Sequence, residues 1–227
     1  MPFTYPYPRP SLTADIVMFG FDGVGLKVLL VQRDVEPFRH AWALPGGFMH
    51  EDETLEACAL RELYEETHFT PDFLEQFHTF STVDRDPRGR VVTTAFFGLM
   101  PVSEVQGGSD AADARWFSLD QLPSLAFDHA EILRVAQSCL RERIYFEPIA
   151  FRLLEPKFTM TELQHVYEVV LGTQFDRRNF QKKMHASKIV APVGERRVAG
   201  PSRPASLYSF VSDQYRTLKH SGVTFEF

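Results

Sequence analysis

Apolar, β-branched and aromatic residues gather in short runs along the first part of the chain, which is typical of β-strands. Two such runs, at 14–21 and 26–33, are separated by a glycine-containing segment at 22–25, which predicts a hairpin. Further strands are expected at 77–83, 91–100 and 114–118. Helical periods predict one helix from about 54 to 67 and another from Asp128, as its N-cap, to about 145.

After residue 147 the pattern becomes mainly helical. A capping box at 159–162 begins a helix that ends at Gly172. A shorter helix is expected from Asp176, followed by two β-like runs at 189–193 and 206–211 around a loop rich in glycine and proline. Helices followed by a β-hairpin within some eighty residues predict a winged helix-turn-helix.

Charge is divided unevenly between these two parts. The whole chain has a formal charge of −6, which by itself argues against binding to nucleic acid, because phosphates repel an acidic protein. Residues 1–146, however, contain 12 basic and 22 acidic side chains, whereas residues 147–227 contain 12 basic and 8 acidic ones. We therefore expect two domains, 1–146 and 147–227, with different partners.

The remaining composition indicates a globular chain in a reducing compartment. With 44% hydrophobic residues the chain can bury a substantial core. Cys58 and Cys139 have neither the number nor the spacing of a disulfide framework or a zinc site. No run approaches the roughly 18 apolar residues of a membrane span, and the first residues lack the layout of a signal peptide. A cytoplasmic location without a membrane partner is therefore expected.

The first predicted helix carries the most informative pattern. On a helical wheel Leu55 and Ala59 face the core, and Glu62 and Glu66 fall on the same stripe, with Glu65 beside them. Carboxylates this close repel one another and resist desolvation, so they need a compensating charge. Because Mg²⁺ and Mn²⁺ prefer hard oxygen ligands, the pattern predicts a site for one of these cations. The alternative is a solvated acidic helix end.

The spacing around this helix resembles the Nudix box, Gly-x5-Glu-x7-Arg-Glu-U-x-Glu-Glu-x-Gly-U, where U is bulky and apolar. Eight of the nine specified positions match between Gly47 and Phe69, and the exception is His68, which stands where the box has glycine. That glycine usually ends the helix in the left-handed conformation, which His adopts at a modest cost. We therefore expect metal binding to survive, and any effect of His68 to fall on the geometry of Glu65 and Glu66 and hence on turnover.

The resemblance implies roles for the box residues. The implied metal ligands are Glu62, Glu65, Glu66 and the carbonyl of Gly46 or Gly47. Arg61 would orient the carboxylates by ion pairing, and Glu53 would brace the loop. The general base would be a box glutamate or one of three distal acids, Glu104, Asp110 and Asp113. Four basic residues near the expected cleft are candidates for contacts to a pyrophosphate, although each is also explained as a surface charge: Arg33, Arg39, Arg85 and Arg88.

Basic residues of the C-terminal part gather on its second predicted helix and its hairpin loop. On this helix Phe180 and Met184 mark the buried face, so Arg178 and Lys182 point the other way. Such groups suit contacts to phosphates and to base edges in a major groove, although a solvated face is the alternative. The predicted DNA-binding residues are Arg177, Arg178, Gln181, Lys182 and Lys183 on the helix and Arg196, Arg197 and Arg203 at the wing.

Over most of its length the sequence resembles Nudix-related transcriptional regulators of the NrtR type, in which a Nudix domain precedes a winged helix. Besides the box, the supporting stretches are 84–90, 125–133, 158–167, 176–180 and 204–208. The resemblance implies an α+β fold, a Nudix α/β/α sandwich with a mixed sheet followed by a winged helix-turn-helix. It also implies a homodimer that binds a double-stranded DNA operator and responds to ADP-ribose, a related nucleotide sugar or a plain sugar.

Two functions follow from these features. The first, which we favour, is a transcriptional regulator whose Nudix domain binds an ADP-ribose-like effector and which controls genes of NAD or sugar metabolism. The second is a Mg²⁺- or Mn²⁺-dependent hydrolase that converts ADP-ribose to AMP and ribose 5-phosphate, with the C-terminal domain as an accessory module. Because all three box glutamates are retained, the first function does not exclude the second.

Overall fold

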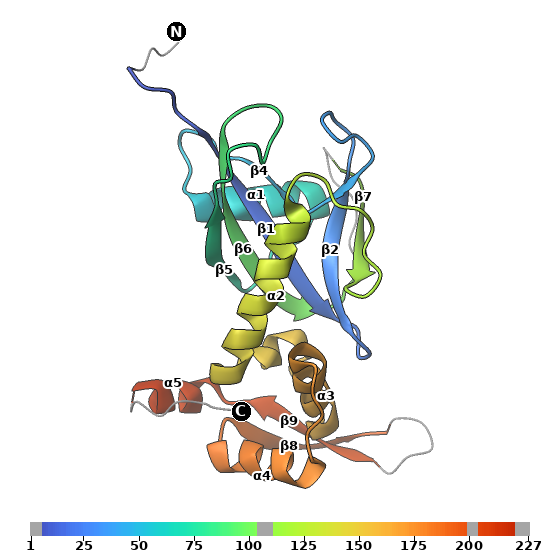
Figure 1. Ribbon diagram of the computed structural model, residues 1–227. Helices are drawn as coiled ribbons and strands as arrows, with labels where there is room; N and C mark the ends of the chain where they lie inside the picture. The colour runs from blue at the N-terminus through green and yellow to red at the C-terminus, as the bar shows by residue number, and fades with distance from the viewer. Residues whose placement is uncertain (1–5, 104–110, 199–203, 221–227) are drawn as a thin grey trace. The chain divides into compact units, whose positions relative to one another are not determined.

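The computed structural model describes residues 6–103, 111–198 and 204–220 of the chain (Figure 1). The chain divides into two compact units, the first comprising 1–20 and 27–137 and the second comprising 21–26 and 138–227. The division falls within the long helix α2 (His129–Phe146). The domain boundary expected after residue 146 lies at the end of this helix and stays a prediction.

The first unit is built on a seven-stranded sheet. Its elements before α2 are β1 (Ser11–Phe21), β2 (Leu26–Arg33), β3 (Trp42–Ala43), β4 (Gly46–Phe48), α1 (Leu55–Thr67), β5 (Leu74–Phe80), β6 (Val91–Pro101) and β7 (Ala111–Ser118). The strand order is β3-β2-β1-β6-β5, with β4 paired to β1 and β7 paired to β2. In the antiparallel β1–β4 pair, Ala14 lies opposite Gly47 and Asp15 opposite Gly46. This register places the two glycines beside the central strand.

The central strand β1 is buried on both faces because successive side chains of a strand point to opposite sides of the sheet. Ala14, Ile16 and Met18 belong to one apolar cluster with the buried face of α1. Val17 and Phe19, which alternate with them, are also fully buried. Helices α1 and α2 lie on opposite faces of the sheet (Figure 1). The first unit is therefore a sheet between helices.

The strands and helices expected in this unit are all present, with some ends displaced. Strand β2 and helix α1 match the expected ranges to within one residue. Strand β5 covers 74–80 rather than 77–83, since the residues after Phe80 leave the sheet and form turns before β6. The sequence missed β3 and β4, which have two and three residues and so carry no alternating pattern.

The second unit has the element order of a winged helix. Its elements after α2 are the 3-10 helix η1 (Ile149–Leu153), α3 (Met160–Leu171), α4 (Arg177–Ser187), β8 (Val190–Arg197), β9 (Ala205–Phe210) and α5 (Ser212–His220). The expected capping box is confirmed, because the side chains of Thr159 and Glu162 each accept from the backbone N–H of the other residue. Gly172 ends α3 with φ 65°, and Asp176 caps α4. Across the described residues, no helix combines the length and the apolar character needed to cross a membrane.

Candidate functional site

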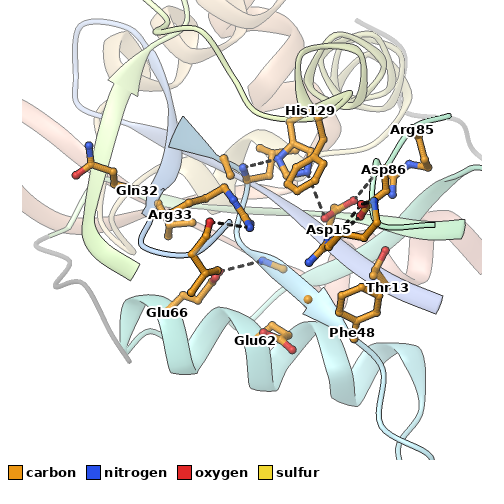
Figure 2. Close-up of a pocket in the computed structure, with 18 of the residues that line it drawn as sticks. Thr13, Asp15, Gln32, Arg33, Phe48, Glu62, Glu66, Arg85, Asp86 and His129 are labelled. Atoms are coloured by element: carbon orange, nitrogen blue, oxygen red, sulfur yellow. Dashed lines mark hydrogen bonds and ion pairs between the residues drawn. The ribbon is translucent and has the colours of Figure 1, made fainter. Parts of the chain in front are cut away.

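A polar cavity of about 240 Å³ opens in the first unit beside the start of β4 (Figure 2). Its walls come from β1, the end of β2, strand β4 and the residues before it, helix α1, the segment 85–88 and the residues at the start of α2. Seven of the residues singled out in the sequence line it, namely Arg33, Gly46, Gly47, Glu62, Glu66, Arg85 and Arg88. The fold thus brings together residues that are up to 55 positions apart in the chain.

Helix α1 carries two of the predicted carboxylates to the cavity. The helix begins after Thr54, whose hydroxyl accepts from the N–H of Ala57. Glu62 and Glu66, one turn apart, line the cavity, and Oε2 of Glu66 accepts from the N–H of Gly46 at 3.0 Å. Glu65 lies outside this lining, with 46% of its side chain exposed. The helical spacing therefore places Glu62 and Glu66 together at the cavity, whereas Glu65 points toward solvent.

Arg61 binds three acidic side chains at once. Its guanidinium donates to Glu53 at 2.6 and 3.0 Å, to Glu62 at 2.7 Å and to Glu65 at 3.2 Å. These bonds hold the pKa of Glu53 at about 2 and raise the pKa of Arg61 itself. Glu53 also accepts from the N–H of His50 at 2.7 Å, so it joins the loop before α1 to the helix. Burial raises the pKa of Glu62 despite its ion pair.

Gly47 lies against Glu62 so closely that a larger residue would not fit. A Cβ atom at this position would stand 2.4 Å from the carboxylate carbon of Glu62. The carbonyl of Gly47 and the carboxylates of Glu62 and Glu66 are hard oxygen donors, the kind that Mg²⁺ and Mn²⁺ prefer. Among the residues that the structure describes, no three His, Cys, Asp or Glu side chains are gathered as a ready metal site. The donors thus fit such a cation in kind, although Arg61 already binds one of these two carboxylates, that of Glu62.

His68 replaces the glycine of the motif without changing how the helix ends. It caps α1 in the left-handed conformation, with φ 55°, and its N–H donates to the carbonyl of Tyr64 at 2.8 Å. The expected tolerance of His at this position is therefore observed. Its ring packs edge-on against Tyr64, with the centroids 5.9 Å apart.

The four predicted arginines fall into different environments. Arg33 and Arg88 line the cavity and contact aromatic rings there. Arg85 also lines it, but its guanidinium is 4% exposed and is bound by Asp15 at 3.1 Å and by Asp128 at 2.7 and 2.9 Å. Arg39 lies outside the lining, where it pairs with Asp34.

Asp15, Asp86 and His129 are residues of the cavity that the sequence did not single out as a site. All three are buried, and His129 accepts a hydrogen bond from the N–H of Leu44. Only Asp15 carried a signal in the sequence, as a charged residue within the apolar run that forms β1. The sequence explained Asp128 and His129 only as a helix cap and first turn.

None of the three distal acids proposed as general base is found at this cavity among the described residues. Asp113 pairs with Arg115 at 2.5 Å on β7 and is not part of the lining. Glu104 and Asp110 fall outside the described residues.

Helix α4 of the second unit presents the predicted basic face. Phe180 and Met184 are buried, as their spacing indicated. The exposed basic residues of this face are Arg177, Arg178, Lys182 and Lys183, with Gln181 half-buried among them. Of the predicted wing residues, Arg196 is exposed, whereas Arg197 pairs with Glu162 at 2.7 Å. Arg203 falls outside the described residues.

Each of the two units matches a known protein family. A family model described as the NUDIX domain matches residues 9–136, and one described as the NrtR DNA-binding winged helix domain matches residues 150–210. The chain is 36% identical over 214 residues to the ADPR responsive transcriptional repressor NtrR of Acinetobacter baylyi, covering 92% of this chain and 85% of that protein. It is 42% identical over 128 residues to an ADP-ribose pyrophosphatase of Methanocaldococcus jannaschii, covering 56% and 73%.

Among solved structures, the chain is similar to Shewanella oneidensis NrtR complexed with a 27mer DNA. The TM-score is 0.80 and the identity 36%, over 90% of this chain and 95% of that one. This match extends through both units. It confirms the α+β fold with a C-terminal winged helix that the sequence predicted.

Proposed function

We propose that this chain, which belongs to the Nudix family and joins a NUDIX domain to an NrtR winged helix, is a transcriptional regulator controlled by ADP-ribose. One observation carries the proposal: the exposed basic face of α4 belongs to a winged helix that follows a Nudix unit with a polar cavity. The exposed Arg and Lys side chains of α4 suit contacts to phosphates and to base edges in a major groove. Because its partner is an operator, the protein acts in the cytoplasm.

Relatives support each half of this proposal separately. The repressor of Acinetobacter baylyi is described as ADPR responsive, and the Shewanella oneidensis protein is described in complex with DNA. The present chain covers most of both proteins. We infer that it likewise binds a double-stranded operator and ADP-ribose, and that it does so as a homodimer, since operators are commonly palindromic.

The test is operator binding by the full chain. Fluorescence anisotropy would compare a duplex from upstream of the neighbouring genes with a random duplex of equal length, over a range of salt concentrations. We expect a clear preference for the upstream duplex, a steep salt dependence, and a change in affinity when ADP-ribose is added. Equal affinity for both duplexes, or an operator affinity indifferent to ADP-ribose, would refute the regulator as proposed.

A second function, hydrolysis of ADP-ribose, is favoured by the retained carboxylates. Glu62 and Glu66 line the cavity beside Gly47, and the Methanocaldococcus jannaschii relative is a pyrophosphatase. We propose that Glu62, Glu66 and the carbonyl of Gly47, which meet at the cavity, would hold Mg²⁺ or Mn²⁺. Such a cation would neutralise a pyrophosphate and lower the pKa of a bound water. Failure to form AMP from ADP-ribose and Mg²⁺ at high enzyme concentration would exclude this second function and leave the first intact.

Within this proposal the chain's own side chains have separate tasks. Arg61 fixes the carboxylate rotamers of Glu62 and Glu65 and neutralises part of their charge. Glu53 holds Arg61 in place and secures the loop through His50. Arg61 and Glu53 are therefore positioning residues.

A further inference from the structure

Two neighbouring arginines at the end of β8 have different surroundings. Arg196 and Arg197 lie in the wing, the antiparallel hairpin of β8 and β9, where they pair with Ser206 and Ala205. Successive side chains of a strand leave it on opposite faces. Arg196 is exposed and makes no ion pair within the described part of the chain, whereas Arg197 is half-buried. The strand thus turns one arginine toward solvent and the other toward the protein.

Both terminal nitrogens of Arg197 donate to the segment that leads into α3. Nη1 donates to Oε1 of Glu162 at 2.7 Å, and Nη2 donates to the carbonyl of Lys157, also at 2.7 Å. The carboxylate of Glu162 is itself held, because its Oε2 accepts from the N–H of Thr159 at 2.7 Å in the capping box. Two bonds to fixed acceptors therefore set the position and the plane of the guanidinium.

The same segment binds the wing at two further points. Glu195, two positions before Arg197, pairs with Nζ of Lys157 at 2.6 Å. On the other strand of the wing, Tyr208 exchanges two backbone hydrogen bonds with Phe158, at 2.8 and 3.0 Å. The wing is therefore attached to the residues around the start of α3 by both of its strands.

The pairing between β8 and β9 is interrupted next to Arg197. Pro192 pairs with Tyr208 and Arg196 with Ser206, so residues 193–195 of β8 face Leu207 alone. Such a bulge leaves backbone groups unpaired and bends the strand. The side-chain bonds of Glu195 and Arg197 thus hold the end of β8 beside the place where the hairpin itself holds it least.

The ion pair of Arg197 suits a geometric role better than a contact to DNA. The side chains of Arg197 and Glu162 are 40% and 39% exposed, and pairs at such sites add little to the free energy of unfolding. The carboxylate also neutralises the charge with which Arg197 would attract a phosphate. A phosphate would have to compete with Glu162 and the Lys157 carbonyl for the same two nitrogens.

We propose that Arg197 is a positioning residue, which fixes the end of β8 to Glu162 and leaves Arg196 as the arginine of this strand that meets the DNA backbone. The inference rests on the proposed function, because it takes operator DNA as the partner. A wing that is held in place beforehand has less conformational freedom to lose when DNA binds. Arg197 therefore raises the affinity without touching the DNA.

The test is operator binding by the full chain, followed by fluorescence anisotropy over a range of salt concentrations. The variants are Arg196→Gln, Arg197→Gln and Glu162→Gln, the last chosen because Gln at this position retains the capping box. Arg197→Gln and Glu162→Gln should each weaken binding about three- to tenfold, the cost of ordering a few side chains. Neither should change the slope of log affinity against log salt, whereas Arg196→Gln should reduce it by about 0.9.

A direct contact between Arg197 and DNA predicts a different result. Arg197→Gln would then reduce the salt slope by about 0.9, because one phosphate contact is lost. Glu162→Gln would tighten binding, because it frees the arginine from its carboxylate. Either outcome would overturn the positioning role.

A double-mutant cycle tests whether the two residues act through each other. The variant Glu162→Gln/Arg197→Gln should bind no more weakly than either single variant, and additive losses would contradict the proposal. Arg197→Lys should recover part of the affinity, because Lys can pair with Glu162 but lacks the fork that also reaches a carbonyl. Arg216→Gln is the matched control, since its ion pair with Asp213 lies within α5, and it should bind like the wild type.

Hydrogen exchange of the DNA-free chain, measured by mass spectrometry, reports on the wing independently of DNA. Segment 190–197 should exchange faster in Arg197→Gln and Glu162→Gln but not in Arg196→Gln, while the circular dichroism spectra stay normal. Unchanged exchange in the first two variants would overturn the proposal. If the wild type bound operator and random duplex equally, the regulator would be refuted, and the exchange rates would still decide whether Arg197 holds the wing.

Discussion

The imidazole of His129 accepts a hydrogen bond through Nδ1 from the backbone N–H of Leu44, at 2.9 Å. The two residues are 85 positions apart, so the bond joins the start of α2 to the loop that leads into β4. Nδ1 accepts a hydrogen bond when it carries no proton, so His129 is neutral in the folded state. Its Nε2 then carries the proton, 3.7 Å from a carboxylate oxygen of Asp15. Burial lowers the pKa of His129, the charges of Arg85 and Arg33 act in the same direction, and those of Asp15 and Asp128 oppose it.

We expect the free energy of unfolding to fall as the pH decreases below about 6.5, the ordinary pKa of histidine. The folded-state pKa of His129 is lower than its unfolded-state pKa, so the unfolded chain takes up the proton first. Stability from this group is therefore fully present above about pH 6.5 and is lost as the pH falls toward the folded-state pKa. The slope has a limit of about 1.4 kcal/mol per pH unit. Urea unfolding at a series of pH values measures it.

The control is His129→Gln, which removes the titrating group at a similar size. This variant should be less stable at neutral pH and should lose the part of the slope that belongs to His129. Glu62, whose pKa is raised, contributes in more acidic solution and with the opposite sign, and it does so in both proteins. An identical slope in wild type and variant would show that another group controls the pH dependence.

Arg85→Met should destabilise the protein strongly. The guanidinium of Arg85 is 4% exposed and binds two carboxylates, so its loss leaves Asp15 and Asp128 without their partner. Breaking a buried ion pair in this way costs about 3–5 kcal/mol. Arg39→Met, in an exposed pair with Asp34, should change stability by at most about 1 kcal/mol. Equally small effects of both substitutions in chemical denaturation would contradict a structural role for Arg85.

Features that lie within one short segment could be predicted from the sequence. The cap of α3 at Thr159 depends on a hydrogen bond between residues only three positions apart. The approach of Glu62 and Glu66 follows from the helix period alone. Strand β5 was placed three residues too late, because it lies at the sheet edge and alternates weakly between exposed and buried positions.

Features that join distant segments were not predictable in the same way. Arg85 meets Asp15 and Asp128 across 70 and 43 positions, and nothing local in the sequence specifies these pairs. From the sequence alone the four arginines could not be distinguished, whereas the fold pairs Arg85 with two carboxylates and places Arg33 and Arg88 against the ring of Phe127. Arg197 is a similar case, since its pairing with Glu162 depends on how the wing meets α3.

Gly47→Ala should displace Glu62 and weaken metal binding. The added Cβ would stand 2.4 Å from the carboxylate carbon of Glu62, so that side chain must move. Mn²⁺ affinity, followed by electron paramagnetic resonance, should fall about tenfold or more, as expected for loss of a charged ligand. Gly25→Ala is the control, because nothing lies within 4 Å of a Cβ there. Unchanged Mn²⁺ affinity in the Gly47 variant would remove Glu62 from the proposed metal ligands.

Arg178→Ala and Glu66→Gln should separate the two activities. Arg178 is exposed on α4, so its loss should weaken operator binding and reduce the slope of log affinity against log salt by about 0.9, the value for one phosphate contact. Glu66 lines the cavity, so its change should impair Mn²⁺ binding and any metal-dependent hydrolysis while leaving operator affinity in the absence of ligand unchanged. Arg216→Ala, an exposed arginine on α5, is the control for charge alone. If Arg178 and Glu66 variants impaired DNA and metal binding equally, the division of labour between the two units would be wrong.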